Sequence, residues 1–268
     1  MSPRRLAFFD VDGTLTTATT IFRFLRYYLA AQGHGPHVYA QRRQELKAMT
    51  AVGVPREATN RAYFTNFRDA DAATVTRLAR TWFEAELVRG GLLNGSAVDA
   101  LRGHVSRGET VVLVSGSFPA VLWPLAEHLG VTDIWATLPE ITDGRYTGHL
   151  LREPMIGTVK ADAARLAASV HGASLTDCFA YGDHLSDLPI LEAVGTPVVV
   201  AGDARLDEHA RLRRWTVLPG APAAPELALG ECVESSRDSS PRRTSPREPV
   251  PEPCRELSPE PSREPSRS

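Results

Sequence analysis

Short apolar runs alternate with longer amphipathic stretches over most of the chain. A continuous apolar run that stops at a turn residue is typical of a parallel strand covered on both faces. Such runs predict strands at residues 6–9, 111–114, 178–181 and 197–201. The amphipathic stretches predict helices at residues 96–106, 118–130, 158–170 and 186–194. The alternation predicts an α/β fold, a Rossmann-like doubly wound parallel sheet.

The region between the first two predicted strands follows a different pattern. Residues 16–90 show helical periodicity, as in IFRFLRYYLAAQ and ATVTRLARTWFEAELV, with no strand-like run between the helices. We therefore expect a helical cap inserted after the first strand of a core built from residues 1–15 and 91–219. Two interpretations of this cap stay open, a lid over a site or additional cover for the core.

The composition changes after residue 219. The stretch PRRTSPREPVPEPCRELSPEPSREPSRS contains almost no large apolar side chain, so it cannot bury enough surface to offset the entropy of ordering. We expect residues 220–268 to form a disordered tail rich in Pro, Ser, Arg and Glu. Either this tail is solvated and without function, or it docks a protein partner.

The overall composition limits the classes of function. With 268 residues, 43% of them hydrophobic, the chain can bury a sizeable core, and its net charge of -2 gives no general attraction to nucleic acid. No apolar run approaches the roughly twenty residues of a membrane span, and no secretory leader is recognisable, so we expect a cytoplasmic protein. Three scattered cysteines are too few for a disulfide framework or a zinc site.

Lysine is rare in this chain. Of the 30 basic residues only Lys47 and Lys160 are lysine, which indicates the coding bias of a GC-rich genome. A lysine that persists against such a bias is a candidate for a site that needs a compact ammonium group.

Two carboxylates follow the first predicted strand, in the sequence FFDVDGTL. Burying Asp10 and Asp12 at a strand end would cost several kcal/mol unless a cation or hydrogen bonds compensated. A magnesium ion provides such compensation, because it binds one or two carboxylates together with phosphate oxygens. The remainder of a calcium-binding loop is missing, which argues against calcium.

Two further groups suit a phosphate. Ser115, Gly116 and Ser117 follow the second strand, where a hydroxyl and free backbone N–H groups at a helix start can bind an anion. Alone, this pattern is more typical of a helix cap than of a phosphate site. Lys160 lies early in a predicted helix and by itself would be an ordinary surface lysine.

A second acidic pair follows the third predicted strand, in YGDHLSDLPIL. Asp183 occupies the same place on its strand as Asp10 does on the first, so a metal ion shared by the two strand ends is the economical interpretation. Asp187 could also simply begin the next helix. His184 beside them is interpreted as a supporting or merely exposed residue.

Taken together, FFDVDGTL, VLVSGS, Lys160 and YGDHLSDLPIL resemble the four motifs of haloacid dehalogenase-like hydrolases. With a helical cap between the first two motifs, the chain resembles subfamily IB, which includes phosphoserine phosphatase. The resemblance covers about residues 4 to 218. It implies a phosphatase that hydrolyses a small-molecule phosphomonoester.

The resemblance also implies roles for individual residues. Asp10 would be the nucleophile that forms an aspartyl-phosphate, and Asp12 would be the general acid and base. The implied phosphate-binding residues are Ser115, Gly116 and Lys160. The implied Mg²⁺ ligands are Asp10, the Asp12 backbone carbonyl and Asp183, with Asp187 in support.

At one position implied to contact the substrate, the sequence departs from the pattern of phosphoserine phosphatases. The resemblance implies a glutamate nine residues after the nucleophile, where this chain has Thr19, so phosphoserine is doubtful. Cap residues that could meet a polar or anionic substrate, or simply form exposed helix faces, are Arg23, Arg26, Tyr63 and Arg68. The other readings are a phosphotransferase or mutase, a phosphonate-cleaving enzyme that forms an imine on Lys47, and a non-catalytic binding protein.

Overall fold

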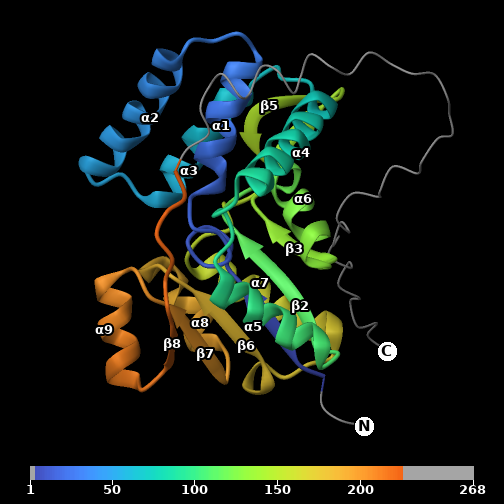
Figure 1. Cartoon of the computed structure of the whole chain (residues 1–268), viewed down its shortest axis with the longest axis vertical. Coiled ribbons are helices and arrows are strands. Elements are labelled where there is room, and N and C mark those ends of the chain that lie inside the picture. Colours follow the sequence, from blue (N-terminus) through green and yellow to red (C-terminus); the bar gives the residue numbers. More distant parts are fainter. Residues whose placement is uncertain (1–3, 226–268) are drawn as a thin grey trace, which may run out of the picture.

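The structure, a computed structural model, describes residues 4–225 and contains the predicted doubly wound sheet (Figure 1). Six strands lie parallel in the order β3-β2-β1-β6-β7-β8. Their bounds are β1 (Leu6–Phe9), β2 (Thr110–Ser115), β3 (Asp133–Ala136), β6 (Phe179–Gly182), β7 (Thr196–Val200) and β8 (Thr216–Leu218). All four predicted strands are confirmed, as β1, β2, β6 and β7.

Helices cover both faces of this sheet because the side chains of each strand alternate between them. Ala7 and Phe9 belong to the hydrophobic cluster on one face, and Leu6 and Phe8 to the cluster on the other. The first face is covered by α5 (Gly95–Ser106) and α6 (Pro119–Leu129). The second is covered by α7 (Thr158–His171), α8 (Leu188–Ala193) and α9 (Ala204–Arg213).

Several elements have no clear signal in the sequence. A two-stranded hairpin, β4 (Pro139–Thr142) and β5 (Arg145–Leu150), leaves the sheet after β3, and β3 itself is the short segment DIWA. Helix α9 reads ARLDEHARLR and buries only Leu206 and Ala210, so its apolar periodicity is weak. Three short 3₁₀ turns are η1 (Thr65–Phe67), η2 (Leu175–Asp177) and η3 (Leu185–Asp187).

Five α-helices lie between β1 and β2: α5, described above, and four that occupy the region expected to form the inserted cap. These cap helices are α1 (Thr20–Ala31), α2 (Pro36–Ala51), α3 (Arg56–Phe64) and α4 (Ala72–Arg89), and they stand together above one end of the sheet (Figure 1). Among the helices described here, none is both long and apolar enough to cross a membrane.

The cap helices share an aromatic core with the sheet domain. Phe118, just before α6, lies 6.1 Å from Phe24 of α1 and 5.4 Å from Phe67, measured between ring centroids. Phe24 also contacts Trp82 of α4 at 5.8 Å. The α1 and α4 side of the cap is therefore fixed to α6 by packed rings.

The chain returns to the cap helices after β8, although the predicted tail begins at residue 220. The segment 219–225 runs upward from the sheet (orange in Figure 1). The guanidinium of Arg23 donates to the carbonyl of Ala224, and that of Arg89 donates to the carbonyl of Pro225 at 3.0 Å. Ala224 of the expected tail is thus buried against the cap helices, and residues 226–268 lie outside the described residues.

Candidate active site

The predicted site residues meet at the carboxyl ends of β1, β2 and β6. The strand order reverses direction next to β1, and ligands of doubly wound sheets bind at such a switch point. A cavity of about 600 Å³ opens there. The predicted residues that line it are Asp10, Asp12, Ser115, Gly116, Lys160, Asp183 and Asp187. The structure thus brings together all seven residues to which the resemblance assigns a role.

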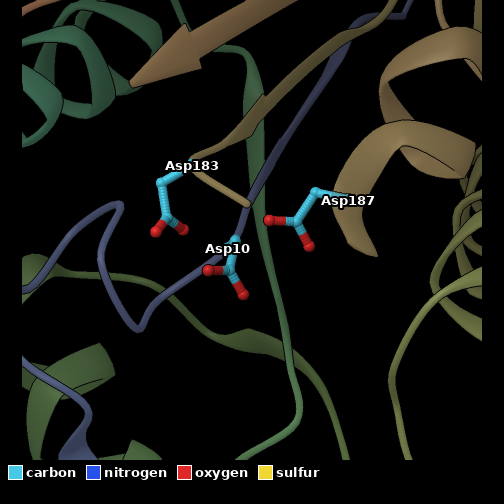
Figure 2. Close-up of side chains that lie close together, drawn as sticks. All are labelled: Asp10, Asp183 and Asp187. Atoms are coloured by element: carbon cyan, nitrogen blue, oxygen red, sulfur yellow. The ribbon is translucent and has the colours of Figure 1, made fainter. Parts of the chain in front are cut away.

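Three carboxylates converge on one point (Figure 2). One oxygen each from Asp10, Asp183 and Asp187 lies within 4.8 Å of the other two. Asp10 directly follows β1, and Asp183 directly follows β6, which is hydrogen-bonded to β1. Asp187 comes from η3 and is 1% exposed. Expected only as a supporting residue, Asp187 is therefore a full member of this cluster.

This cluster suits a hard cation such as Mg²⁺. Its donors are carboxylate oxygens, which Mg²⁺ prefers. Burial, together with the charges of Asp10 and Asp187, raises the pKa of Asp183 to about 8 when no cation is bound. A positive ion at this point would relieve the repulsion, so the residues present fit the metal that the resemblance implies.

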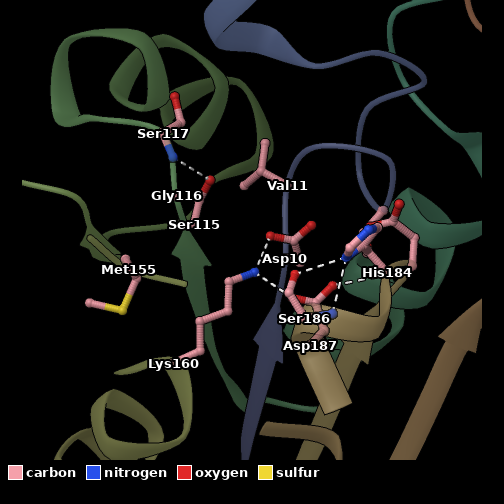
Figure 3. Close-up of polar contacts among 12 residues, drawn as sticks. Asp10, Val11, Ser115, Gly116, Ser117, Met155, Lys160, His184, Ser186 and Asp187 are labelled. Carbon is pink, nitrogen blue, oxygen red and sulfur yellow. Dashed lines mark hydrogen bonds and ion pairs between the residues drawn. The ribbon is translucent and has the colours of Figure 1, made fainter. Parts of the chain in front are cut away.

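Lys160 reaches into the same cluster from α7 (Figure 3). Its ammonium lies 2.5 Å from Asp10 Oδ1 and 2.7 Å from Asp187 Oδ1. Burial disfavours the charged form of Lys160, which is 4% exposed, but the two carboxylates outweigh that cost and raise its pKa. Lys160 is therefore a fixed positive charge beside Asp10.

Asp12 is held apart from the three converging carboxylates. Its Oδ1 accepts a hydrogen bond of 2.8 Å from the backbone N–H of Thr20, at the start of α1. Burial, with a contribution from the charge of Asp10, raises the pKa of Asp12 to about 6. A carboxyl group with such a pKa can exchange a proton near neutral pH.

The turn after Asp12 requires glycine. Gly13 has φ +94°, and a Cβ built there would lie 2.0 Å from Asp183 Oδ2. The next residue, Thr14, donates from its hydroxyl to Asp183 Oδ1 at 3.1 Å. The backbone at Gly13 therefore approaches Asp183 as closely as it can, and Thr14 orients that carboxylate.

The turn after β2 lines the cavity with Ser115 and Gly116. The backbone N–H of Ser117 donates to Ser115 Oγ at 3.1 Å, which leaves the Ser115 hydroxyl hydrogen free to donate into the cavity. Asn60 of α3 donates from its amide to the carbonyl of Gly116 at 3.1 Å. This contact joins the cap to the turn after β2, and nothing in the sequence identifies Asn60.

The cap forms the opposite wall of the cavity, and a second contact joins it to the core. Arg56 Nη1, at the start of α3, donates to Ser186 Oγ at 2.9 Å and lies 2.8 Å from His184 Nδ1. His184 is exposed and supports this contact. Sequence reasoning did not single out Arg56, because a lone arginine after Pro55 has no distinguishing pattern.

The four cap residues that could meet a substrate lie in different surroundings. Tyr63 lines the cavity, and its hydroxyl donates to the carbonyl of Ile21 at 2.7 Å. Arg23 neither meets the cavity nor forms an exposed face, so both interpretations of it are wrong. It is buried and lies 2.9 Å from Glu86 of α4, because an ion pair inside the cap satisfies both charges. Arg26 and Arg68 are not among the described residues that line the cavity.

Comparison with known proteins identifies the class. A family model for haloacid dehalogenase-like hydrolases matches residues 7–192, so the chain belongs to that family. This agrees with the order of strands and motifs described above.

Individual relatives indicate which class of enzyme within this family the chain resembles. A probable phosphatase from Mycobacterium tuberculosis (strain H37Rv) is 34% identical over 224 residues, which cover 80% of this chain and 75% of the relative. A phosphoserine phosphatase from the same strain is 30% identical over 216 residues, which cover 79% and 69%. A crystal structure of a Bordetella pertussis Tohama I protein of unknown function has a TM-score of 0.73 at 29% identity, and the match covers 81% of this chain and 99% of that one.

Family and relatives together show a phosphoric monoester hydrolase of the haloacid dehalogenase-like type.

Proposed function

We propose that this phosphatase is Mg²⁺-dependent and hydrolyses a small-molecule phosphomonoester through an aspartyl-phosphate on Asp10. The observation that carries the proposal is the meeting of Asp10, Asp12, Ser115 and Lys160 around one cavity. A nucleophile, a proton carrier and two donors for phosphoryl oxygens are the groups that this reaction needs.

The first step transfers the phosphoryl group to the enzyme. A carboxylate oxygen of Asp10 attacks phosphorus, and the bond between phosphorus and the ester oxygen breaks. Asp12 donates its proton to that leaving oxygen, so an alcohol departs. Lys160 and Ser115 donate hydrogen bonds to the phosphoryl oxygens, where negative charge accumulates in the transition state.

The second step releases inorganic phosphate. Asp12, now a carboxylate, takes a proton from a water molecule, whose oxygen attacks phosphorus as the bond to Asp10 breaks. Asp10 and Asp12 return to their starting states, so the cycle balances. The Mg²⁺ ion would be held by Asp10, Asp183 and the Asp12 backbone carbonyl, with Asp187 nearby. When bound, it would supply positive charge to the phosphoryl group.

The Asp12–Thr20 contact supports the assignment of Asp12 as the proton carrier. A hydrogen bond from the first residue of α1 keeps its carboxylate out of the cluster formed by Asp10, Asp183 and Asp187. The Asp12 side chain therefore remains available to the leaving group.

The test is release of inorganic phosphate from a panel of phosphomonoesters, with Mg²⁺ or with EDTA. Asp10→Asn should lower kcat by at least about a thousandfold without lowering the melting temperature. Asp162→Asn is the matched control, because Asp162 is an exposed aspartate on α7 paired with Arg165. Release that survives in Asp10→Asn, or that EDTA leaves unchanged, would reject the proposal.

A further inference from the structure

We infer that the cap wall of the cavity binds a second anionic group of the substrate, a carboxylate or a second phosphate. The inference rests on the proposed function, because the phosphate that is cleaved places the substrate at Asp10. It defines the substrate class as phosphomonoesters that carry another negative charge away from the ester.

The charges that line the cavity are segregated. Arg43 and Lys47 of α2 and Arg56 of α3 line its cap side. Among the described lining residues, no Asp or Glu comes from the cap helices, and the acidic ones all belong to the strand-end motifs. The whole chain has a net charge of -2, so a cationic wall does not follow from its composition.

The arrangement on α2 places these cations on one face. Arg43, Lys47 and Thr50 all line the cavity, and residues four and three apart on a helix are neighbours on its surface. Arg42 points elsewhere and lies 3.5 Å from Glu45 on the exposed side. The helix therefore separates a paired, solvent-facing arginine from the residues that face the cavity.

Arg43 is held in position by an aromatic ring. The centre of its guanidinium lies 3.6 Å above the ring centroid of Phe22, which also lines the cavity. A guanidinium stacked in this way keeps its N–H groups available at the edge of its plane. The stacking orders a long side chain in advance, which lowers the entropy lost when a ligand binds.

Lys47 extends the observation on lysine usage. The only two lysines of the chain, Lys47 and Lys160, line the same cavity from opposite sides. Lys160 is paired with two carboxylates, whereas in the described part of the chain neither Lys47 nor Arg43 forms an ion pair. Two cations without carboxylate partners in a ligand cavity favour an anion from outside the protein.

The same wall disfavours a cationic substrate. An ammonium group there would face Arg43, Lys47 and Arg56, and like charges in a cavity repel. Position 19 also carries a threonine and not an acid, so it offers no carboxylate that could pair with an ammonium group. We therefore expect phosphate esters with an amino group as their only other charge to be poor substrates.

The experiment compares alkyl phosphates of equal length that end in a carboxylate, a hydroxyl, an amine or a second phosphate. The carboxylate or bisphosphate substrate should have a kcat/KM roughly tenfold or more above that of the hydroxyl substrate, with the amine lowest. The difference should appear in KM and decrease with added salt. Comparing the two anionic ends over several chain lengths identifies which anion the wall takes.

Variants on α2 test which residues cause the preference for an anionic end. Arg43→Gln and Lys47→Gln should each lower kcat/KM for the anionic substrate about tenfold and leave the hydroxyl substrate unchanged. Lys47→Arg should restore most of the preference. Arg42→Gln is the matched control, and it should change neither substrate.

Two outcomes would overturn the inference, and they have different consequences for the proposed function. If the hydroxyl substrate is hydrolysed and all four ends give equal kcat/KM, the second subsite is wrong and the proposed function stands. If no substrate, p-nitrophenyl phosphate included, releases phosphate with Mg²⁺, the proposed function fails and the inference fails with it.

Discussion

The ammonium of Lys160 lies 2.5 Å from Oδ1 of Asp10, and both side chains are almost completely buried. Burial raises the pKa of Asp10, and the contact with this fixed cation opposes that shift and orients the carboxylate while no substrate is present. The same cation contacts Asp187 at 2.7 Å, so one ammonium group offsets the charge of two carboxylates.

Replacing this lysine should therefore affect both stability and activity. Lys160→Met keeps the length of the side chain, removes its charge, and leaves the carboxylates of Asp10 and Asp187 buried without the cation that pairs with them. We expect a loss of about 3 kcal/mol in the free energy of unfolding and no measurable phosphate release. Added MgCl₂ should recover part of the stability, since a bound cation stabilises the folded state. Urea unfolding with and without MgCl₂ measures both effects.

The control for this variant is Lys47→Met, because Lys47 is the only other lysine and is exposed. Its stability should stay within about 0.5 kcal/mol of wild type. Equal unfolding curves for wild type and Lys160→Met would contradict the role of Lys160.

A single methyl group at Gly13 should disable the cation site without removing a ligand. In Gly13→Ala the new Cβ would lie 2.0 Å from Asp183 Oδ2 and would displace that carboxylate. We expect loss of phosphate release and loss of the rise in melting temperature that MgCl₂ produces in the wild type. Thermal unfolding over a MgCl₂ titration measures the second effect.

Gly33→Ala separates this effect from backbone strain. Gly33 has φ +83°, close to the +94° of Gly13, but no other atom lies within 4 Å of the place of its Cβ. It should cost about 1–2 kcal/mol of stability and retain both activity and the response to MgCl₂. A Gly13→Ala protein that behaves like Gly33→Ala would show that the space beside Asp183 is not needed.

The segment 219–225 should contribute to stability although it follows the last strand. A chain that ends after Pro219 loses the carbonyl groups that accept hydrogen bonds from Arg23 and Arg89. Since Arg23 is buried, we expect a loss of about 1–3 kcal/mol in the free energy of unfolding. A chain that ends after Pro225 should match the full-length protein in stability and turnover. Identical melting temperatures for the two truncations would contradict this role.

Asp203 should stabilise the fold in a pH-dependent way. Its carboxylate begins α9 and accepts hydrogen bonds from the N–H groups of Arg205 and Leu206, and from Leu185 N–H at 3.0 Å. Burial alone would raise the pKa of Asp203, but these three donors outweigh it and lower that pKa. A carboxyl with a lowered pKa in the folded state stabilises fully above its unfolded pKa, and the contribution disappears as the pH falls through the folded value.

Asp203→Ala should therefore lower the free energy of unfolding by about 1 kcal/mol near neutral pH. The difference from wild type should shrink as the pH falls below about 4, the ordinary pKa of an unfolded Asp, and disappear below the lower folded pKa of Asp203. Urea unfolding across this pH range gives the profile, with Asp162→Ala on the surface of α7 as the control. A difference that stays constant down to the lowest pH would show that charge has no part in this cap.

Much of the fold and site could be predicted from local sequence. The strands β1, β2, β6 and β7 are continuous apolar runs, so the hydrophobic pattern was enough to predict them. The residues after β1, β2 and β6 form compact motifs, so their position at the strand ends was enough to predict that they meet. The weakly patterned α9 and the short, mixed β3 and β8 were missed, because their burial depends on neighbours distant in sequence.

Contacts between the cap and the core could not be predicted for the same reason. Asn60 on Gly116 and Arg56 on Ser186 depend on how α3 is placed, and Arg23 is buried where Glu86 of α4 and the carbonyl of Ala224 face it. The cytoplasmic location and the absence of a nucleic-acid partner stay predictions from composition.

The segment 219–225 affects how the cavity can open. The cap helices are continuous with the core at two neighbouring points, before α1 and after α4, and a body joined at two points can swing about the line between them. The segment 219–225 adds a third attachment beside these points, because Arg23 and Arg89 donate to its carbonyls and the Ala224 N–H donates to Thr17 Oγ1 at 3.2 Å, and the ring of Phe118 adds a fourth. A rigid swing of all four helices would have to break these contacts, whereas α2, with Leu46 as its one buried residue, is held far less tightly. We therefore expect the substrate to enter by movement of α2 and not by rotation of the whole cap.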